Sequence, residues 1–539
     1  MGIIGAHWPR TVRMRSGLLV VGAMLAPFTA LLGQEGHAAA ASTTDPVSQA
    51  IVGAIIAGVF ILLTLEAAHR VLVAMGAVAL LFAISYFTPY RLITFEGVAQ
   101  ALDFNVLVLL ASMMAVVGVL KSTGVFEWGV GHLMQRAGPR PYVLLALIGW
   151  FTALLSAFLD NVTTVIFVTP MVLGMARRLR LDPAVYLLPM IMASNIGGTA
   201  TLIGDPPNIM IGSGANLSFL DFLEDLTLPC ALMILWLEWY TKRYYADALR
   251  AAQPVGEGAA SLPTPLADPT LARWLGVICA GILAGFLTHH LTGMPPAVPA
   301  LIGAAAALAV QDRLYMRSAR PTAEERTHGI LHVTEHDIEW PTLSFFGFLF
   351  IVVGAAVQTG LIERLAGALQ WTVVSGAHVM GLSSSGTLLF AALLICWVSG
   401  ALSALIDNIP FVAVAIPIVA RLIPGMGANA DVLWWALSLG ACLGGNGTVI
   451  GASANVTTVG LAEHEGVRIS FRDFARYAAP MTVGTLVIAS GYLALHIYMG
   501  KAGSFAAMAL IVGVVATVRL VSGRVARGPV PLPGRAGGA

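Results

Sequence analysis

Two stretches of this sequence occur twice, and the later copies keep the register of the earlier ones. The segment SAFLDNVTTVIFVTPMV (156–172) resembles SALIDNIPFVAVAIPIV (403–419). The segment GGTATLIGDPPN (197–208) aligns with GGNGTVIGASAN (444–455) at the same separation. An unchanged register across two distant motifs is not expected by chance. The sequence therefore predicts a fold built from two copies of one unit.

The composition places these copies in a membrane. Hydrophobic residues make up 58% of the 539 residues and charged residues only 11%, with a mean hydropathy of +0.84. A soluble domain carries about a quarter charged residues, and a helix needs about 20 apolar residues to cross a bilayer. We therefore expect an all-α polytopic membrane protein in contact with lipid. With a net charge of +1, no nucleic-acid partner is expected.

Apolar runs between charged residues predict about 11 full membrane spans and two suspect segments. The suspect segments, 142–175 and 387–424, are each interrupted in the middle by a carboxylate and an asparagine. Most of the 29 Lys and Arg residues fall in cytoplasmic loops if the mature N-terminus is outside and both segments are re-entrant hairpins. This interpretation places the C-terminus in the cytoplasm and the protein in the inner membrane. The predicted spans begin near Val47, Val71, Phe104, Val185, Leu226, Leu271, Pro296, Trp340, Val432, Tyr477 and Phe505.

The same pattern predicts the domain organisation. Residues 1–41 have the layout of a secretory signal peptide, with a retained first helix as the alternative. A first repeat spans 47–243, a cytoplasmic linker spans 244–270, and a second repeat spans 271–522 before a cytoplasmic tail, 523–539. An odd number of crossings separates the corresponding first spans of the repeats, so the second repeat is expected to be inverted.

Each repeat carries a segment, 194–212 or 442–460, in which glycine and other helix-breaking residues are dense enough to unwind a membrane helix. Non-helical backbone is tolerated at membrane depth only where protein or water surrounds it, and its free carbonyls can coordinate cations. The alternative is close helix packing through small residues. The candidates for ligand contact are Asn195, Gly198, Thr199, Thr201, Asp205 and Asn208 in the first copy, and Gly445, Asn446, Thr448, Ser453 and Asn455 in the second.

Acidic residues mark the middle of both predicted hairpins. Asp160 and Asn161, with Thr163 behind them, match Asp407 and Asn408. A carboxylate inside a membrane is costly unless it is paired or hydrated. These motifs contain no basic residue, so protonation or a bound Na⁺ at the hairpin tips is expected to neutralise the acids. The alternative is helix capping, a role that Asp and Asn favour.

Asp205 is a third intramembrane acid, and its aligned residue in the second copy is Ala452. His289 and His290 have no ligand partners at metal spacing, so we expect them to face solvent in a short external loop. The sequence contains no Walker A motif and no catalytic motif of the hydrolase or metalloprotease type, so neither ATP drive nor an enzyme is expected. No cofactor is expected beyond Na⁺ or H⁺ as coupling ion.

With both motif pairs, the sequence resembles the ion transporter superfamily. This group contains arsenite permeases, D-type sodium/proton antiporters, citrate and dicarboxylate symporters, and the melanosomal P protein. The resemblance covers roughly residues 47–520, and NIGGTATLIGDPPNIMIG together with DNVTTV is most similar to the arsenite permease and P-protein branch. It implies a scaffold part and a moving transport part in each protomer, elevator-type movement, and homodimers.

The resemblance also implies that the hairpin tips bind sodium or substrate. In the dicarboxylate branch the tips read Ser-Asn-Thr, whereas this chain has Asp in place of Ser, and Val162 or Ile409 in place of Thr. The added negative charges disfavour a di- or tricarboxylate. The sequence therefore predicts a permease for a small ion or anion, coupled to H⁺ or Na⁺. A citrate/dicarboxylate–Na⁺ symporter and an uncoupled channel remain the alternatives, and the sequence does not choose the substrate.

Overall fold

The computed structural model describes residues 45–525, apart from residues 66, 138–139, 179–181, 252–264, 320–332 and 428. The expected signal peptide and nearly all of the expected tail lie outside this part. Every regular element in the described ranges is a helix, and none is a strand. The contacts divide the chain into two units, one formed by residues 1–103 and 340–365 and the other by 104–339 and 366–539.

The first unit is a small helical bundle in which α16 packs against the three other helices. Gly354 in α16 allows a close approach, because a Cβ there would lie 2.5 Å from Ala101 Cβ in α4. At the end of α16, Gln358 Oε1 accepts a hydrogen bond of 3.2 Å from Thr94 N, which precedes α4. The helices of this unit are α2 (Pro46–Thr64), α3 (Arg70–Phe87), α4 (Phe95–Ala101) and α16 (Trp340–Gln358).

The second unit contains both copies of the repeated motifs. Its helices before the second copy are α5 (Phe104–Lys121), α6 (Val125–Ala137), α7 (Pro141–Phe158), α8 (Asn161–Arg178), α9 (Ala184–Thr199), α10 (Pro206–Ala215), α11 (Phe219–Tyr244), α12 (Ala246–Ala251), α13 (Pro269–Thr292) and α14 (Ala297–Ala319). Those of the second copy are α18 (Ser384–Ser403), α19 (Asn408–Leu422), α20 (Val432–Gly444), α21 (Ser453–His464) and α22 (Phe471–Val525). Helix α17 (Leu361–Val379) contains the boundary between the units.

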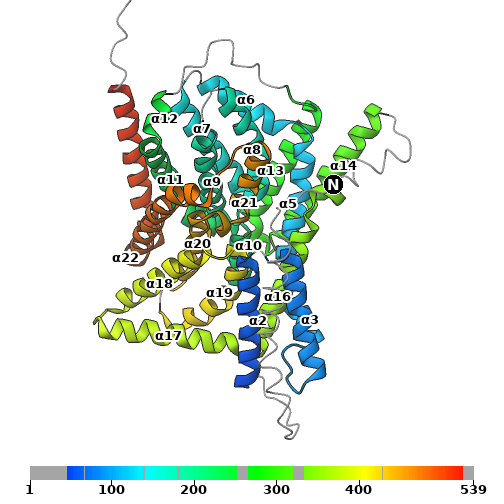
Figure 1. Cartoon of the computed structure of the whole chain (residues 1–539), viewed down its shortest axis with the longest axis vertical. Coiled ribbons are helices and arrows are strands. Elements are labelled where there is room, and N and C mark those ends of the chain that lie inside the picture. Colours follow the sequence, from blue (N-terminus) through cyan, green and yellow to red (C-terminus); the bar gives the residue numbers. More distant parts are fainter. Residues whose placement is uncertain are drawn as a thin grey trace, which may run out of the picture. The chain divides into compact units, whose positions relative to one another are not determined.

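The order of elements is the same in both copies of the motifs. Helices α7, α8, α9 and α10 of the first copy correspond to α18, α19, α20 and α21 of the second. Each predicted hairpin is a pair of helices interrupted at the aspartate, and each glycine-rich segment interrupts a helix at the predicted place. In Figure 1, α6 and α8 lie toward one end of this unit and α18 and α19 toward the other, with α10 and α20 between them.

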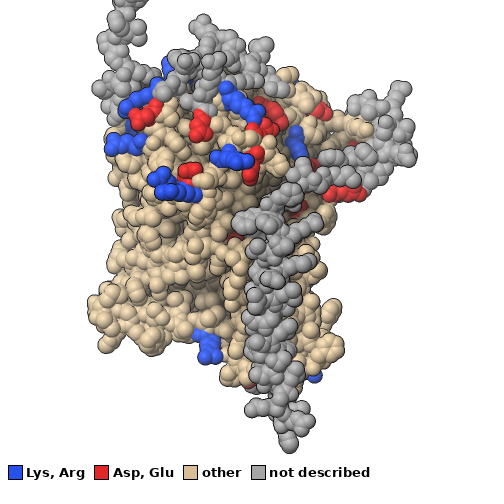
Figure 2. Space-filling view, viewed as in Figure 1, with Lys and Arg blue, Asp and Glu red and all other residues tan. Residues whose placement is uncertain are grey.

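Ten helices in the described ranges are long and apolar enough to cross a membrane. A helix is present at each predicted span, but those at Val185, Leu226 and Val432 are not among these ten. Helices α7, α18 and α19 of the predicted hairpins are among them. Gly500, with a φ of 71°, breaks α22 where two successive spans were expected. On the face shown in Figure 2, most Lys and Arg side chains gather toward the end where α6 and α12 lie in Figure 1. A broad uncharged surface lies below them. The helices and their apolar, span-length segments confirm that the protein is an all-α membrane protein.

Candidate functional site

The hairpin tips are built around the two predicted aspartates. Thr163 donates its backbone N–H to Asp160 Oδ1 over 2.9 Å, and its hydroxyl donates to Asp160 Oδ2. Ile409 N donates to Asp407 Oδ1 over 3.2 Å, and Ser453 Oγ donates to Asp407 Oδ2 over 3.0 Å. Both carboxylates therefore cap the helix that follows them, as Asp does at many helix N-termini. Both side chains are also partly exposed.

The glycines of the two breaks allow backbone to pack directly on backbone. A Cβ at Gly197 would lie 2.5 Å from Ala153 Cα, and one at Gly444 would lie 2.5 Å from Gly400 Cα. Within the breaks, a Cβ at Gly198 would lie 2.6 Å from Gly204 O. A Cβ at Gly445 would likewise lie 2.8 Å from Gly451 O. These four glycines are therefore required for close packing, which was the alternative reading of the sequence.

The two breaks are held against the hairpins by matched threonines. The hydroxyl of Thr201 donates to Ala157 O, and Thr448 Oγ1 donates to Ala404 O over 2.6 Å. Thr199 Oγ1 donates to Asn195 O over 2.7 Å, within its own helix. In this conformation the hydroxyl hydrogens of these three candidate ligands bond to the backbone.

Asn208 and Asn455 close their breaks in the same way. Asn208 Nδ2 donates to Thr199 O at 3.0 Å and Thr201 O at 2.9 Å. Asn455 Nδ2 donates to Gly445 O and Thr448 O, both at 2.8 Å. An amide is suited to this position because its nitrogen satisfies carbonyls freed by the break while its oxygen remains an acceptor.

The amide oxygens of these two asparagines face the other copy of the motif. Asn208 Oδ1 accepts hydrogen bonds from Ser438 Oγ at 2.6 Å and Cys442 Sγ at 3.6 Å, both in α20. Asn455 Oδ1 accepts from Asn195 Nδ2 at 2.9 Å. The two breaks are thus linked to each other by side-chain hydrogen bonds.

A chain of four buried side chains, which we call the amide chain, runs through the centre of this arrangement. Asn161 Nδ2 donates to Asp205 Oδ1 over 3.3 Å and to Asn195 Oδ1 over 3.2 Å. Asn195 Nδ2 in turn donates to Asn446 Oδ1 over 2.8 Å. None of the four is more than 4% exposed. The amide chain connects a hairpin tip of the first copy with the breaks of both copies.

Two atoms of the amide chain lack hydrogen-bond partners within the described part of the protein. They are Asp205 Oδ2 and Asn446 Nδ2, and both are buried. Buried polar atoms are nearly always paired, so such atoms call for an explanation. Among the described residues, no Lys, Arg or His side chain forms an ion pair with Asp160, Asp205 or Asp407. The region therefore combines three carboxyl groups with amides and no basic partner.

The structure thus brings together candidates from both copies. Asn408, the first residue of α19, is buried at the second hairpin tip. The sequence analysis did not identify Ser438 as a site residue. The one feature that could have pointed to it is its position one helical turn before Cys442 on α20, which ends at the second break. Ligand binding by any of these residues stays a prediction.

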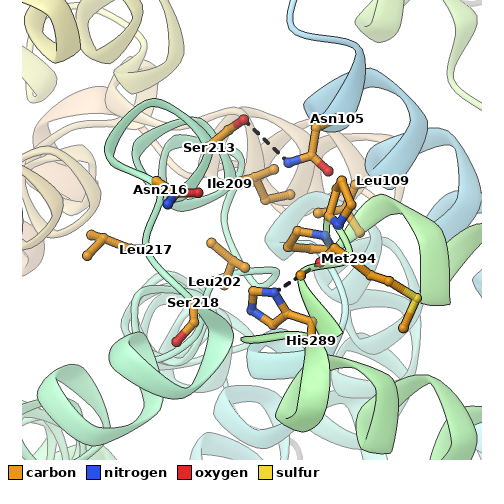
Figure 3. Close-up of a pocket in the computed structure, with 14 residues that line it drawn as sticks. Asn105, Leu109, Leu202, Ile209, Ser213, Asn216, Leu217, Ser218, His289 and Met294 are labelled. Atoms are coloured by element: carbon orange, nitrogen blue, oxygen red, sulfur yellow. Dashed lines mark hydrogen bonds between the residues drawn. The ribbon is translucent and has the colours of Figure 1, made fainter. Parts of the chain in front are cut away.

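A separate cavity of about 430 Å³ lies beside the first break (Figure 3). Leu202 and Ile209 line it from the break, and Asn105 Nδ2 in α5 donates to Ser213 Oγ in α10 over 3.3 Å. His289 also lines the cavity.

The expectation that His289 faces solvent is wrong. It belongs to α13 and is only 9% exposed. Its Nε2 accepts a hydrogen bond of 3.1 Å from Phe219 N, and Nδ1 lies 3.3 Å from Met294 O. A carbonyl can only accept, so Nδ1 carries the hydrogen. The side chain satisfies the start of α11, which local sequence did not indicate. The side chain of His290 lies outside the described residues.

Comparison with known proteins identifies the family to which the chain belongs. The CitMHS family, described as Citrate transporter, matches residues 60–440. An uncharacterized transporter of Mycobacterium bovis is 35% identical over an alignment of 448 residues that covers 82% of this chain and 96% of that protein. The P protein of Homo sapiens is 30% identical over 521 residues, covering 84% of this chain and 60% of the P protein.

The fold also resembles a solved structure. The YdaH transporter of Alcanivorax borkumensis, described as having an unusual topology, superposes with a TM-score of 0.53 at 16% identity. The match covers 80% of this chain and 99% of that chain, and supports the fold alone. With sequence matches over most of its length and a helical membrane fold, this chain belongs to the CitMHS citrate transporter family and is a multi-pass membrane transporter.

Proposed function

We propose that this protein is a secondary active transporter of the inner membrane that moves a small ion or anion and is coupled to H⁺ or Na⁺. The observation that carries the proposal is the group of three carboxyls, Asp160, Asp205 and Asp407, around buried amides without a basic partner among the described residues. Carboxyls at membrane depth are costly as free charges, and their neutralisation by a proton or cation couples binding to movement. Each elementary charge that crosses the field contributes about 2.3 kcal/mol per 100 mV.

In this proposal the substrate or co-ion binds between the two hairpin tips and the two breaks. Asp160 and Asp407 are partly exposed and alternate between loaded and empty states. The duplicated motifs form an inverted pair, and the segment that carries them moves against a scaffold in the manner of an elevator. The protein acts as a homodimer with the mature N-terminus outside and the C-terminus in the cytoplasm.

The test uses purified protein in liposomes that contain a pH-sensitive dye. Sodium, lithium, arsenite and citrate are added outside in turn, with protein-free liposomes as control. A proton flux triggered by sodium or lithium supports cation/proton antiport. Uptake of arsenite or citrate without a cation response supports substrate or co-ion binding at the tips. Absence of any response, or a conductance that persists with one ion type alone, contradicts coupled transport.

Citrate–Na⁺ symport is the second candidate, and the family match favours it. Against it stand Asp160 and Asp407, whose negative charges repel a tricarboxylate that is not accompanied by cations. The same liposomes distinguish the candidates, because symport requires citrate uptake that depends on external sodium.

A further inference from the structure

We propose that Asp205 carries the coupling proton, one per transport cycle, and that it makes the two copies of the motif functionally unequal. This inference rests on the proposed function, since it names the group that takes the proton. Asp205 and Ala452 occupy the same position in the two copies.

The backbone does not need a carboxyl at this position. Asp205 has φ −142° and ψ 130°, and Ala452 has φ −148° and ψ 142°, so both residues precede their helix in the same conformation. The side chain of Asp205 makes no capping hydrogen bond to α10. Since Ala452 supports the equivalent break without any polar side chain, the Asp205 carboxyl is not explained by folding.

The surroundings of Asp205 disfavour a charge. The residue is 1% exposed, Oδ1 accepts a single hydrogen bond of 3.3 Å from Asn161, and Oδ2 has no partner among the described residues. An ionised carboxylate in such a place costs several kcal/mol. A neutral carboxylic acid loses much less on burial, so we assign the protonated form of Asp205 to this conformation.

The titratable groups near Asp205 in the described part of the chain include no base. Those that face Asp205 are Asp160 and Asp407 at the tips and the Cys442 thiol in α20. Two of them are acids and the third is a neutral thiol that lies 3.6 Å from Asn208 Oδ1, so none supplies a compensating positive charge. Negative charge at either tip therefore favours a proton on Asp205.

This arrangement gives a simple cycle. When movement hydrates the site, the O–H bond of the Asp205 carboxyl breaks and the proton passes to water, which leaves the carboxylate. Reprotonation from the opposite side restores the buried, neutral form and permits the return movement. Because the matched position in the second copy is Ala452, that copy offers no second proton site of this kind.

The first test measures the proton directly and requires no substrate. Infrared difference spectra of purified full-length protein after a pH jump report the C=O stretch of a protonated carboxyl. We expect this band in the wild type and in Asp247→Asn, a control at a fully exposed acid, and its loss in Asp205→Asn and Asp205→Ala. Asp205→Ala is expected to fold because Ala452 already occupies the equivalent position.

The second test measures coupling with labelled sodium, arsenite and citrate in liposomes whose membrane potential is clamped at zero. One proton per cargo supports up to about tenfold accumulation per pH unit. We expect this ratio in the wild type, and a ratio near one with retained exchange in both Asp205 variants. A carboxyl band unchanged in these variants, or accumulation equal to the wild type, would overturn the inference.

Two other outcomes separate the proposals. A wild type that shows the Asp205 band but moves none of the probes contradicts the proposed function and leaves the proton site supported. The other outcome is that the wild type lacks the band, that sodium raises its thermal stability, and that this effect is lost in Asp205→Ala. It would show that the Asp205 carboxylate binds sodium and would overturn the inference that Asp205 carries a proton.

Discussion

Asn195 donates its side-chain amide to Asn446 Oδ1 over 2.8 Å and so joins residues that are 251 positions apart. Both side chains are completely buried. The bond connects the helix that ends at the first break with the turn that forms the second. It joins the polar residues of the two motifs in one hydrogen-bonded cluster, although each motif looks complete by itself.

The first prediction concerns the glycines at which backbone meets backbone. Gly197→Ala and Gly444→Ala each place a Cβ 2.5 Å from a Cα of the facing helix, and backbone cannot move aside as a side chain can. We expect each variant to lose about 1–3 kcal/mol of stability, as overpacking does. The measurement is the thermal unfolding midpoint in detergent.

The matched control is Gly149→Ala in α7, where a new Cβ has no atom within 4 Å. Replacing a helical glycine that has free space by alanine is expected to stabilise the helix by up to about 1 kcal/mol. Equal midpoints for Gly197→Ala and Gly149→Ala would contradict the packing described here.

The second prediction concerns the asparagines that close the breaks. Asn208→Ala and Asn455→Ala remove the amide that satisfies two buried carbonyls and the oxygen that accepts from the other copy. We expect a loss of about 1–3 kcal/mol for each, the cost of leaving buried polar groups unpaired. Asn208→Asp should be at least as destabilising, because a carboxylate oxygen would face the carbonyls of Thr199 and Thr201.

Unfolding midpoints in detergent test this prediction. Gln135→Ala serves as control, since it removes an exposed side-chain amide from α6. If the buried variants unfold within the range of this control, the break geometry does not depend on the two asparagines.

The third prediction separates the capping and ion-binding roles of the tip aspartates. Asp160→Asn and Asp407→Asn keep an oxygen that can accept the N–H of Thr163 or Ile409, so both proteins should remain folded. Loss of the negative charge should abolish coupled transport. Unfolding midpoints and liposome flux measure the two properties separately. Retained pH-dependent exchange in both variants would leave the aspartates with a capping role alone.

The fourth prediction concerns a charged cluster around the break in α22. Lys501 Nζ lies 2.9 Å from Glu224 Oε2, 3.2 Å from Asp225 Oδ2 and 3.4 Å from Asp221 Oδ1. Burial opposes the charge on Lys501, but the Glu224 hydrogen bond and the neighbouring carboxylates outweigh it and raise the pKa of Lys501. Burial likewise opposes the charge on Asp221, yet hydrogen bonds from Ser218 and the Lys501 charge lower the pKa of Asp221.

These shifts give the cluster a defined pH dependence. A lowered pKa of Asp221 contributes stability above its unfolded value of about 3.9, and the contribution is lost as pH falls through the folded value. A raised pKa of Lys501 contributes stability below about 10.4, and the contribution is lost as pH rises through the folded value. Between about pH 5 and 9 both contributions are complete.

We therefore expect Lys501→Met to lower the free energy of unfolding by about 1–2 kcal/mol at neutral pH. This loss is smaller than that expected for breaking a fully buried ion pair, because Lys501 is half exposed. The difference from the wild type should shrink below about pH 4 as Asp221 is protonated. Unfolding midpoints across pH measure it. Arg177→Met, which removes the exposed pair with Glu465, is the control and should cost less than about 1 kcal/mol. A difference that grows in acid would contradict this assignment.

The sequence by itself determined the membrane class, the places where helices break and the acids at those places. These features are local: glycine and proline disrupt a helix through their own backbone, and an aspartate before an apolar run is recognisable as a cap or a charge. The duplication was equally visible, because matching residues such as Asn208 and Asn455 recur in register. The interior position of His289 was not visible, since nothing near it in the sequence indicates that Phe219 N will need an acceptor.

Only the tertiary structure decided which polar atoms satisfy one another. Asn195 donates hydrogen bonds to Asn446 and Asn455, and Ser438 donates one to Asn208. Asp205 Oδ2 has no hydrogen-bond partner among the described residues. Hydrogen-bond partners inside a membrane protein depend on which helices are brought into contact, and these helices lie far apart in the chain. The sequence therefore supplied the buried carboxyl, and the packing of the two copies left its Oδ2 atom without a hydrogen-bond partner among the described residues.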